Sequence, residues 1–344
     1  MLGLPVRWPI IGAPMAGGPS TPALAAAVSE AGGMGFLAAG YRTGEAMSAE
    51  IAAVRSLTPA PFGVNLFMPQ DPSVDDRAVA DYLATLRPEA TRFGVEVVPS
   101  WDDDGWDDKL HRLEADPVPV VSFTFGCLDP SVITGLQRAG SRVVVTVTTP
   151  DEARAAAAAG VDAVGAQGIE AGGHQGTFDD HRPLDEGWGL DDLVDAITEE
   201  VSVPAIAAGG LADGADVARV IAAGAVGAQL GTALLRSPES GAPRIYKAAL
   251  ADPAFATGTG LTRAFSGRRA RGLVNAFMRD HPDAPSAYPQ INNATRALRR
   301  QATEHGDAQV INLWAGLGFR SAEARPAGEI ISTIGRRFEV LRGR

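Results

Sequence analysis

Eight short runs of valine, isoleucine, alanine and glycine recur along the first 235 residues, and this recurrence constrains the fold more than any other feature of the chain. The runs are Pro9–Met15, Met34–Ala39, Phe62–Phe67, Val118–Gly126, Arg142–Thr149, Asp162–Gly168, Val203–Gly210 and Ala225–Leu235. Apolar runs that alternate with helical stretches are typical of parallel strands buried on both faces. Eight units in about 240 residues match the size of a (β/α)8 TIM barrel. An open doubly wound sheet is the main alternative, because strand count alone does not show closure.

Helix start signals follow several of these runs. Thr21–Ala31 has Ser20 or Thr21 as a capping residue, and Pro150–Ala159 has Thr149. A third helix is predicted over Asp213–Ala223. These helices support the alternating pattern that a barrel requires.

The domain organisation follows from the lengths between the runs. Residues 1–237 are expected to form the barrel, and the long stretch between the third and fourth strands predicts an excursion around 68–117. Residues 238–320 are expected to cap the barrel mouth, with a strand in Thr262–Gly272 and a helix over Asn292–His305. In 321–344, apolar residues spaced by three and four predict a helix, Ala327–Leu341, that packs back on the barrel.

Composition and charge exclude several classes of protein. A net charge of −11 opposes binding to nucleic acid or anionic membranes. No apolar stretch of about 18 residues predicts a membrane span, and the N-terminus lacks a signal-peptide pattern, so we expect a cytoplasmic protein. The single cysteine, Cys127, excludes an intrachain disulfide and is interpreted as a packing residue. The acidic run Trp101–Asp108 is interpreted as a solvated loop and helix start.

The predicted strand ends carry almost no charge. In a barrel of this kind the active site lies where the strands end, and Glu170 supplies the only nearby carboxylate, so we expect no metal site. The two lysines, Lys109 and Lys247, do not end a strand, which excludes a Schiff-base lysine. Neutral amides, glycines, a threonine and a methionine remain. This set suits a planar heteroaromatic ring.

Glycine-rich turns follow the last three predicted strands. Ala166–Gly176 carries His174 after two glycines, and Gly209-Gly210 and Gly231-Thr232 end strands seven and eight. The loops after these two strands form the usual phosphate site in barrels, and backbone N–H groups at helix N-termini bind anions. Tight turns alone would explain either glycine pair, but both pairs together favour a phosphate site. Phosphate plus planar ring indicates FMN.

These pieces also carry a family resemblance. The chain resembles the FMN-dependent nitronate monooxygenases of the first class, formerly called 2-nitropropane dioxygenases. The matching segments are Ile11–Gly18, Phe62–Phe67, Val121–Gly126, Ala166–Gly176, Ala207–Gly210, Gln229–Thr232 and Ala264–Gly272. They run through most of the chain in the family's order.

The resemblance implies roles for individual residues. His174 is implied to be catalytic, and the implied FMN contacts are Met15, Asn65, Gln167, Gly172, Gly209, Gly210, Gln229, Leu230, Gly231 and Thr232. A histidine in this loop could instead have no catalytic role and form only a hydrogen bond to the phosphate or to a loop carbonyl. However, an imidazole, whose ordinary pKa is near 6.5, is well suited to abstract a proton from the carbon next to a nitro group. The four other histidines are expected at the surface or in the cap.

The cap departs from the family pattern. Two aromatic residues and a lysine are expected at spacings of four, and this chain has Tyr288, Asn292 and Arg296 there. Tyr288 and Arg296 are the candidate substrate contacts. Arg268 and Arg271 are interpreted either as residues that hold the cap in place or as further substrate contacts.

The expected activity is oxidation of alkyl nitronates with O2 to a carbonyl and nitrite, and propionate 3-nitronate is one candidate substrate. Three alternatives stay open: an FMN-dependent enoyl-acyl-carrier-protein reductase, an NAD(P)H:quinone reductase of the same fold, and a flavin-binding protein without nitronate turnover. The expected partners are a small nitronate and O2, with assembly as a homodimer left open.

Overall fold

The eight apolar runs form one parallel sheet that closes on itself. The computed structural model describes residues 1–343. Strand order in the sheet is β1-β9-β8-β6-β5-β4-β3-β2, and a parallel bridge between Ile11 and Met34 joins its two edges. The barrel strands are β1 (Ile10–Gly12), β2 (Gly35–Ala38), β3 (Phe62–Phe67), β4 (Val120–Thr124), β5 (Arg142–Val147), β6 (Ala163–Gln167), β8 (Ala205–Ala208) and β9 (Gly227–Leu230). The predicted (β/α)8 barrel is therefore confirmed, and the open-sheet alternative is excluded.

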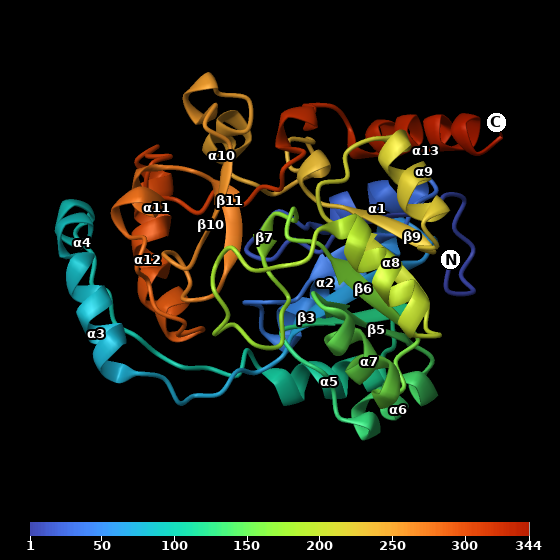
Figure 1. Ribbon diagram of the computed structural model, residues 1–344, viewed down its shortest axis with the longest axis horizontal. Helices are drawn as coiled ribbons and strands as arrows, with labels where there is room; N and C mark the ends of the chain where they lie inside the picture. Colours follow the sequence, from blue (N-terminus) through green and yellow to red (C-terminus); the bar gives the residue numbers. More distant parts are fainter. Residues whose placement is uncertain (344) are drawn as a thin grey trace.

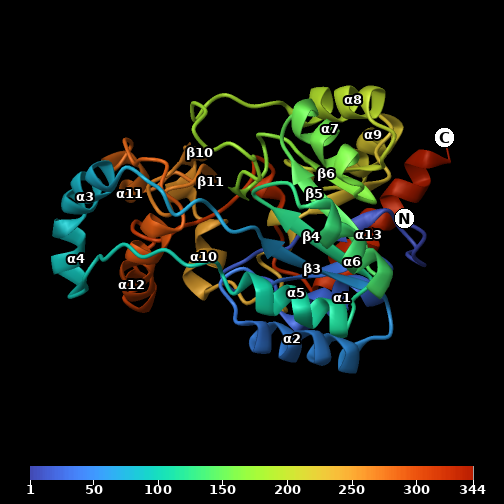
Figure 2. The ribbon, with the colours of Figure 1, turned by 90° about the horizontal axis from the view of Figure 1, so that it is seen from below.

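Helices surround the barrel on its outside (Figures 1 and 2). They are α1 (Pro22–Glu30), α2 (Gly44–Leu57), α5 (Trp106–Ala115), α6 (Pro130–Ala139), α7 (Pro150–Ala159), α8 (Leu190–Glu200), α9 (Gly214–Ala222) and α13 (Ala327–Arg342). The C-terminal helix α13 packs against both α9 and α1, so it occupies the eighth helical position of the ring. Its apolar face, which includes Ile330, Ile334 and Phe338, is buried.

Local sequence explains where these helices begin. The Thr21 and Thr149 hydroxyls accept hydrogen bonds from the N–H groups of Leu24 and Glu152, as the capping signals predicted. Each such cap contributes about 1 kcal/mol. Helix α9 begins with a reciprocal capping box between Asp213 and Asp216.

Two separate apolar clusters stabilise the barrel, one between the sheet and the surrounding helices and one at the amino-terminal ends of the strands. The larger one lies between the sheet and its helices, with Leu37, Val64 and Ile197 among its members. A smaller cluster at the amino-terminal ends of the strands contains Ile11 and Phe36, and the first residues of the chain pack against it. The bottom of the barrel is thus closed, and the open end lies at the carboxyl ends of the strands.

A second body covers that open end (Figure 1). It contains α3 (Asp76–Thr85), α4 (Arg87–Phe93), α10 (Arg244–Ala249), α11 (Ala276–Asp280), α12 (Gln290–Glu304) and the 3-10 turns η2 (Pro253–Phe255) and η3 (Phe319–Ser321). The 3-10 turn η1 (Thr232–Leu234) directly follows β9 and packs in the barrel cluster. Helices α3 and α4, from the excursion after β3, pack against α12. One apolar cluster joins them, with Leu83, Phe93 and Leu298 among its members.

A small antiparallel sheet connects this cap to the barrel rim. Its strands are β10 (Thr259–Thr262), β11 (Ala270–Leu273) and β7 (Gly173–His174), in the order β10-β11-β7. Ala270 pairs with His174, and Arg271 pairs with Gly173. The single strand predicted over Thr262–Gly272 is wrong, because residues 263–269 form a loop between two strands.

Candidate functional site

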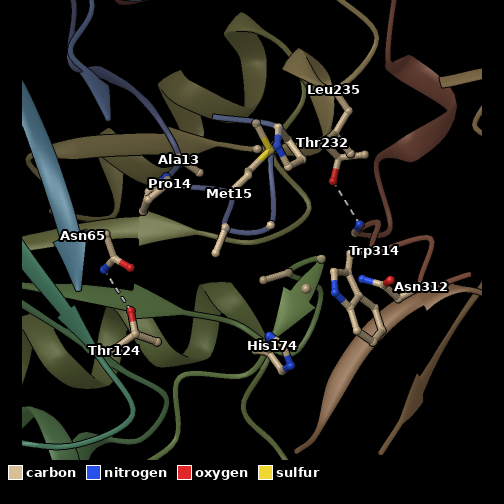
Figure 3. Close-up of a pocket in the computed structure, with 18 of the residues that line it drawn as sticks. Ala13, Pro14, Met15, Asn65, Thr124, His174, Thr232, Leu235, Asn312 and Trp314 are labelled. Carbon is tan, nitrogen blue, oxygen red and sulfur yellow. Dashed lines mark hydrogen bonds between the residues drawn. The ribbon is translucent and has the colours of Figure 1, made fainter. Parts of the chain in front are cut away.

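A cavity of about 480 Å³ lies between the carboxyl ends of the barrel strands and the cap. Figure 3 shows its lining, with Asn65 and Thr124 on one side and Asn312 and Trp314 on the other. Most of the residues singled out from the sequence line it: Met15, Asn65, Gln167, Gly172, His174, Gly209, Gly210, Gln229, Gly231, Thr232 and Arg296. Leu230 does not, since its side chain is fully buried in the barrel core.

One end of the cavity is built for an anion. Gly209 and Gly210 have φ angles of +131° and +68°, which residues with a Cβ rarely adopt. Within residues 1–343, the backbone N–H groups of Gly209, Gly210, Gly231 and Thr232 have no hydrogen-bond acceptor. The Thr232 hydroxyl accepts a bond from the Gly316 N–H at 3.0 Å, which leaves its own hydrogen free. These donors are the chemistry that a phosphate requires.

The start of α9 does not contribute to this anion site. The Asp213 carboxylate accepts bonds from the N–H groups of Ala215 and Asp216, and Asp216 accepts from those of Ala212 and Asp213. The expectation of a helix N-terminus pointing at the phosphate is therefore wrong for α9. The free donors belong to the two loops themselves.

The middle of the cavity is neutral. Asn65 Nδ2 donates to Ser122 O, Ser122 Oγ and Thr124 Oγ1 at 3.0–3.2 Å, which leaves its Oδ1 as an acceptor. Gln229 lines the cavity, and the Met15 sulfur lies on the Gly231 side of it. A heteroaromatic ring with both donors and acceptors on its edge fits these neighbours.

Gln167 and Gly172 shape the loop that carries His174. Gln167 donates to the His174 carbonyl at 3.1 Å and accepts from the Gly176 N–H at 2.6 Å, so its amide holds the loop. A Cβ on Gly172 would lie 2.4 Å from the Gly316 nitrogen. Glycine is therefore required there, because the 315–316 backbone passes against it.

Among the histidines in the described residues, only His174 lines the cavity. Its Nε2 lies 2.8 Å from Ser266 Oγ, and Ser266 Oγ donates to the Arg268 carbonyl at 3.1 Å. Because the hydroxyl hydrogen goes to that carbonyl, His174 Nε2–H donates to Ser266, which leaves Nδ1 as a bare acceptor. Burial, together with the charges of the Arg268 and Arg299 guanidiniums, lowers the pKa of His174 to about 3, although Asp180 opposes the shift. The imidazole is neutral near pH 7.

Aromatic rings surround His174 and limit access of water. The ring centres of Phe125, Tyr288 and Trp314 lie 5.7, 5.8 and 5.4 Å from the imidazole. Tyr288 does not line the cavity, and its hydroxyl donates to that of Tyr41 at 3.2 Å. Trp314 was not identified from the sequence, because only the fold brings its loop beside β7.

A buried carboxylate holds the loop opposite His174. Asp180 accepts from Arg263 Nε at 3.0 Å, from the Arg269 N–H at 3.0 Å and from Ser286 Oγ at 2.8 Å. These bonds fix the segment between β10 and β11, which includes Ser266. Asp180 follows the histidine loop by a few residues, but the sequence does not show which carboxylate turns inward.

Helix α12 places arginines on the cavity wall. Arg296, Arg299 and Arg300 all line it. Arg299 donates to the Asn292 carbonyl at 2.8 Å and to Asn292 Oδ1 at 2.9 Å, and burial lowers its pKa to about 10. In the described part of the chain none of the three forms a salt bridge with a carboxylate. Asn292 thus orients Arg299. The sequence alone did not identify Arg299 as a residue of the site.

Arg268 and Arg271 connect loops through hydrogen bonds. Arg268 donates to Gln70 Oε1 at 2.7 Å and to the Thr177 carbonyl, and its guanidinium lies 3.9 Å from the Phe125 ring centre. Arg271 donates to the Ile169 carbonyl at 2.8 Å. Neither lines the cavity.

Two expectations about carboxylates need correction, and the places of the other polar residues can now be described. The acidic run is not wholly solvated, since Asp104 forms a 2.7 Å ion pair with Lys109, whose side chain is 1% exposed. A second carboxylate, Glu152, is buried beside the strand end at Thr148. Among the other histidines, His281 is buried in the cap 3.1 Å from Glu89 Oε1. Across residues 1–343, no cluster of three or more acidic, histidine or cysteine side chains could hold a metal ion.

The fold and the site together define a (β/α)8-barrel enzyme whose cavity has unpaired backbone N–H groups at one end. The sequence model described as nitronate monooxygenase matches residues 3–336. A probable nitronate monooxygenase from Staphylococcus saprophyticus is 37% identical over 96% of this chain and 94% of its own, and one from Staphylococcus aureus is 38% identical with the same coverage.

Solved structures agree with these sequence relatives. The nitroalkane oxidase of Streptomyces ansochromogenes has a TM-score of 0.96 and 52% identity, covering 98% of both chains. FabK from Thermotoga maritima has a TM-score of 0.76 and 30% identity, covering 99% of this chain and 96% of its own. The chain belongs to the nitronate monooxygenase family and is an oxidoreductase. None of the helices in residues 1–343 has both the length and the apolar character of a membrane span.

Proposed function

We propose that the protein oxidises alkyl nitronates with O2 and FMN, giving a carbonyl compound and nitrite, with propionate 3-nitronate as one candidate substrate. The observation that carries this proposal is a single cavity that holds a phosphate-type anion loop, a neutral amide-lined middle and the imidazole of His174. Family membership and the nitroalkane oxidase likeness support oxidation of nitro compounds.

The residues present fit FMN. The free N–H groups of Gly209, Gly210, Gly231 and Thr232 would hold its phosphate. The Asn65 Oδ1 acceptor, the Gln229 amide and Met15 would contact its ring. FMN would supply the redox chemistry for oxidation of a nitronate by O2 when it is bound there.

The protein's own contribution is binding, orientation and proton handling. His174 Nδ1 is a bare acceptor in a neutral imidazole, so it can take the α-proton of a nitroalkane. A nitronate has already lost that proton, so the protein needs only to bind it between His174 and the flavin ring. The surrounding aromatic residues exclude water, and the nearby Arg299 and Arg296 offset the negative charge of the ligand.

The test is to mix the purified flavoprotein anaerobically with a nitronate and, in separate samples, with NADH and NADPH. Loss of the oxidised flavin spectrum with the nitronate alone, followed by nitrite release on addition of O2, is the expected result. Bleaching by a pyridine nucleotide but not by the nitronate would show that the proposal is wrong.

One alternative has an observation in its favour. The likeness to FabK from Thermotoga maritima, at 30% identity, shows that the same fold and cap are shared beyond the nitronate monooxygenases, which keeps the reductase alternatives open. The net charge of −11 opposes binding of an acidic carrier protein. A flavin bleached by neither reagent would instead indicate a flavin-binding protein without nitronate turnover.

A further inference from the structure

Tyr41 has a backbone conformation that needs an explanation. Its φ angle is +66°, a left-handed value that is unfavourable for a residue with a Cβ. Such conformations persist where surrounding contacts hold them, and they gather at binding sites. Tyr41 follows the end of β2, and its side chain lines the cavity.

A buried ion pair holds this backbone in place. The Tyr41 N–H donates to Asp104 Oδ1 at 2.8 Å, and Lys109 Nζ donates to the Ala39 carbonyl at 3.0 Å. Asp104 and Lys109 pair with each other at 2.7 Å, and Lys109 is almost fully buried. Both residues belong to the excursion after β3. A lysine and a carboxylate are therefore removed from water in order to fix the two residues around Gly40.

The phenol that this backbone places in the cavity has one unused hydrogen. Tyr288 donates to the Tyr41 hydroxyl at 3.2 Å, and the Tyr41 hydroxyl has no acceptor of its own among the described residues. Whichever hydroxyl of the pair donates, one O–H remains for a ligand. Tyr41 lines the cavity and Tyr288 does not, so that hydrogen is available at Tyr41.

The charges around Tyr41 favour an anionic acceptor. Arg296 lies 5.8 Å from the centre of its ring, and Arg299 lines the same wall. Burial raises the pKa of Tyr41, while its bond to Tyr288 and the charge of Arg299 oppose that rise, so the phenol stays protonated near pH 7. A protonated donor beside two guanidiniums suits a ligand oxygen that carries negative charge.

We propose that Tyr41 contacts the substrate, donating its phenolic hydrogen to an oxygen of a planar oxyanion group, and that the Asp104–Lys109 pair is the device that positions it. The inference rests on the proposed function for the identity of that group as a nitronate. Tyr41 is then a residue that determines specificity, and Asp104 and Lys109 act through it.

Sodium nitrate is the probe, because it is a planar oxyanion that cannot be turned over as a nitronate. Its dissociation constant is measured on the flavin-loaded protein by difference spectra and, independently, by the shift in Tm. Tyr41→Phe is expected to weaken nitrate binding about tenfold, the loss of one hydrogen bond to a charged group. Tyr82→Phe is the matched control, because its buried hydroxyl donates to Ala264 O in the cap, away from the cavity. It should bind nitrate within twofold of the wild type.

Asp104→Asn tests the positioning device. It should weaken nitrate binding when Tyr41 is present and have no further effect in combination with Tyr41→Phe, because both changes act on one contact. Asp116→Asn removes a carboxylate from an exposed ion pair with Arg55 and serves as the control. A purely structural role for Asp104 would lower Tm and leave the nitrate affinity unchanged.

The outcomes separate this inference from the proposed function. Unchanged nitrate affinity in Tyr41→Phe, or no saturable nitrate binding by the wild type, overturns the contact. If Asp104→Asn and Lys109→Gln both fail to fold, the pair is a folding element and the positioning role is wrong. If nitrate binding depends on Tyr41 but the wild type does not turn over nitronates, the proposed function fails and the oxyanion contact remains.

Discussion

His174 Nε2 and Ser266 Oγ lie 2.8 Å apart, although one belongs to a barrel loop and the other to the segment between two cap strands. The contact fixes which ring nitrogen faces the cavity. It also makes the cap part of the surroundings that orient His174, since the hydroxyl comes from outside the barrel.

Replacing His174 by alanine should abolish most turnover of a nitroalkane, the substrate that needs a base, and leave flavin binding intact. Removal of a general base typically lowers the rate by about 10²–10⁴-fold, and the anion loop and Asn65 do not depend on the imidazole. Nitrite release and the flavin absorbance per protein are the measurements. His181→Ala, at an exposed histidine, is the control. Loss of flavin in His174→Ala would make the histidine a binding residue.

Ser266→Ala should lower kcat about fivefold to tenfold with unchanged flavin content, because a net hydrogen bond contributes about 1 kcal/mol. The imidazole would lose the partner of Nε2 and the fixed orientation of Nδ1. Steady-state kinetics with a preformed nitronate and with the parent nitroalkane check the result. A larger effect on the nitroalkane is expected, because only that substrate needs a base. Ser56→Ala, at an exposed helical serine, should change neither rate.

The depressed pKa of His174 predicts how stability depends on pH. The folded state binds the imidazole proton only near pH 3, whereas the unfolded chain binds it below about pH 6.5. The unfolded state therefore gains protons as pH falls from 6.5 towards 3, and this contribution to stability, present above pH 6.5, is lost over that range. At pH 5 the loss is about 2 kcal/mol.

Unfolding followed at pH 7 and pH 5 checks this sign. His174→Gln should lose less stability between the two values than the wild type does. An equal loss in both proteins would mean that His174 is not the titrating group.

Gly172→Ala should disrupt the loop that carries His174. The added Cβ would lie 2.4 Å from the Gly316 nitrogen, and that neighbour is backbone, which cannot move aside cheaply. We expect reduced flavin content and a lower Tm, measured by absorbance and thermal unfolding. Gly328→Ala, in α13, meets only ordinary contacts of 3.5 Å or more and should leave both unchanged.

Asp180→Asn should destabilise the protein by about 3 kcal/mol or more, because it breaks a buried ion pair and leaves the Arg263 charge uncompensated. Chemical denaturation measures the change. Asp151→Asn removes a carboxylate from an exposed pair with Arg154 and should change stability by less than about 1 kcal/mol. Similar effects of the two substitutions would argue against Asp180 as the residue that holds the loop.

The barrel could be predicted from the sequence because its signal is local and repeated. Each strand is a short apolar run, and each capping threonine lies next to the helix that it starts. The pairing of β11 with β7 joins residues almost a hundred positions apart, so the run Thr262–Gly272 gave no sign that a loop divides it.

The candidate site likewise contains some residues that the sequence could predict and others that it could not. The residues on the barrel side of the cavity could be predicted because they lie at strand ends, whose place in a barrel is known in advance. Tyr41, Asp180, Arg299 and Trp314 could not, because their roles depend on which distant loop lies beside them. Composition alone predicts that the polar run containing Asp104 is solvated, because it does not show that Lys109 of α5 reaches the end of β2.

The pairing of β7 with β11 has a consequence for anyone who wishes to make a smaller version of this enzyme. A chain cut after residue 237 would keep all eight barrel strands and the loops after β8 and β9, but it would lose α13, which completes the ring of helices. It would also leave the backbone of Gly173 and His174 without its partner strand and remove the hydroxyl that orients the imidazole. A minimal scaffold must therefore retain the β10–β11 hairpin, or supply a substitute strand, before its histidine can have a defined direction.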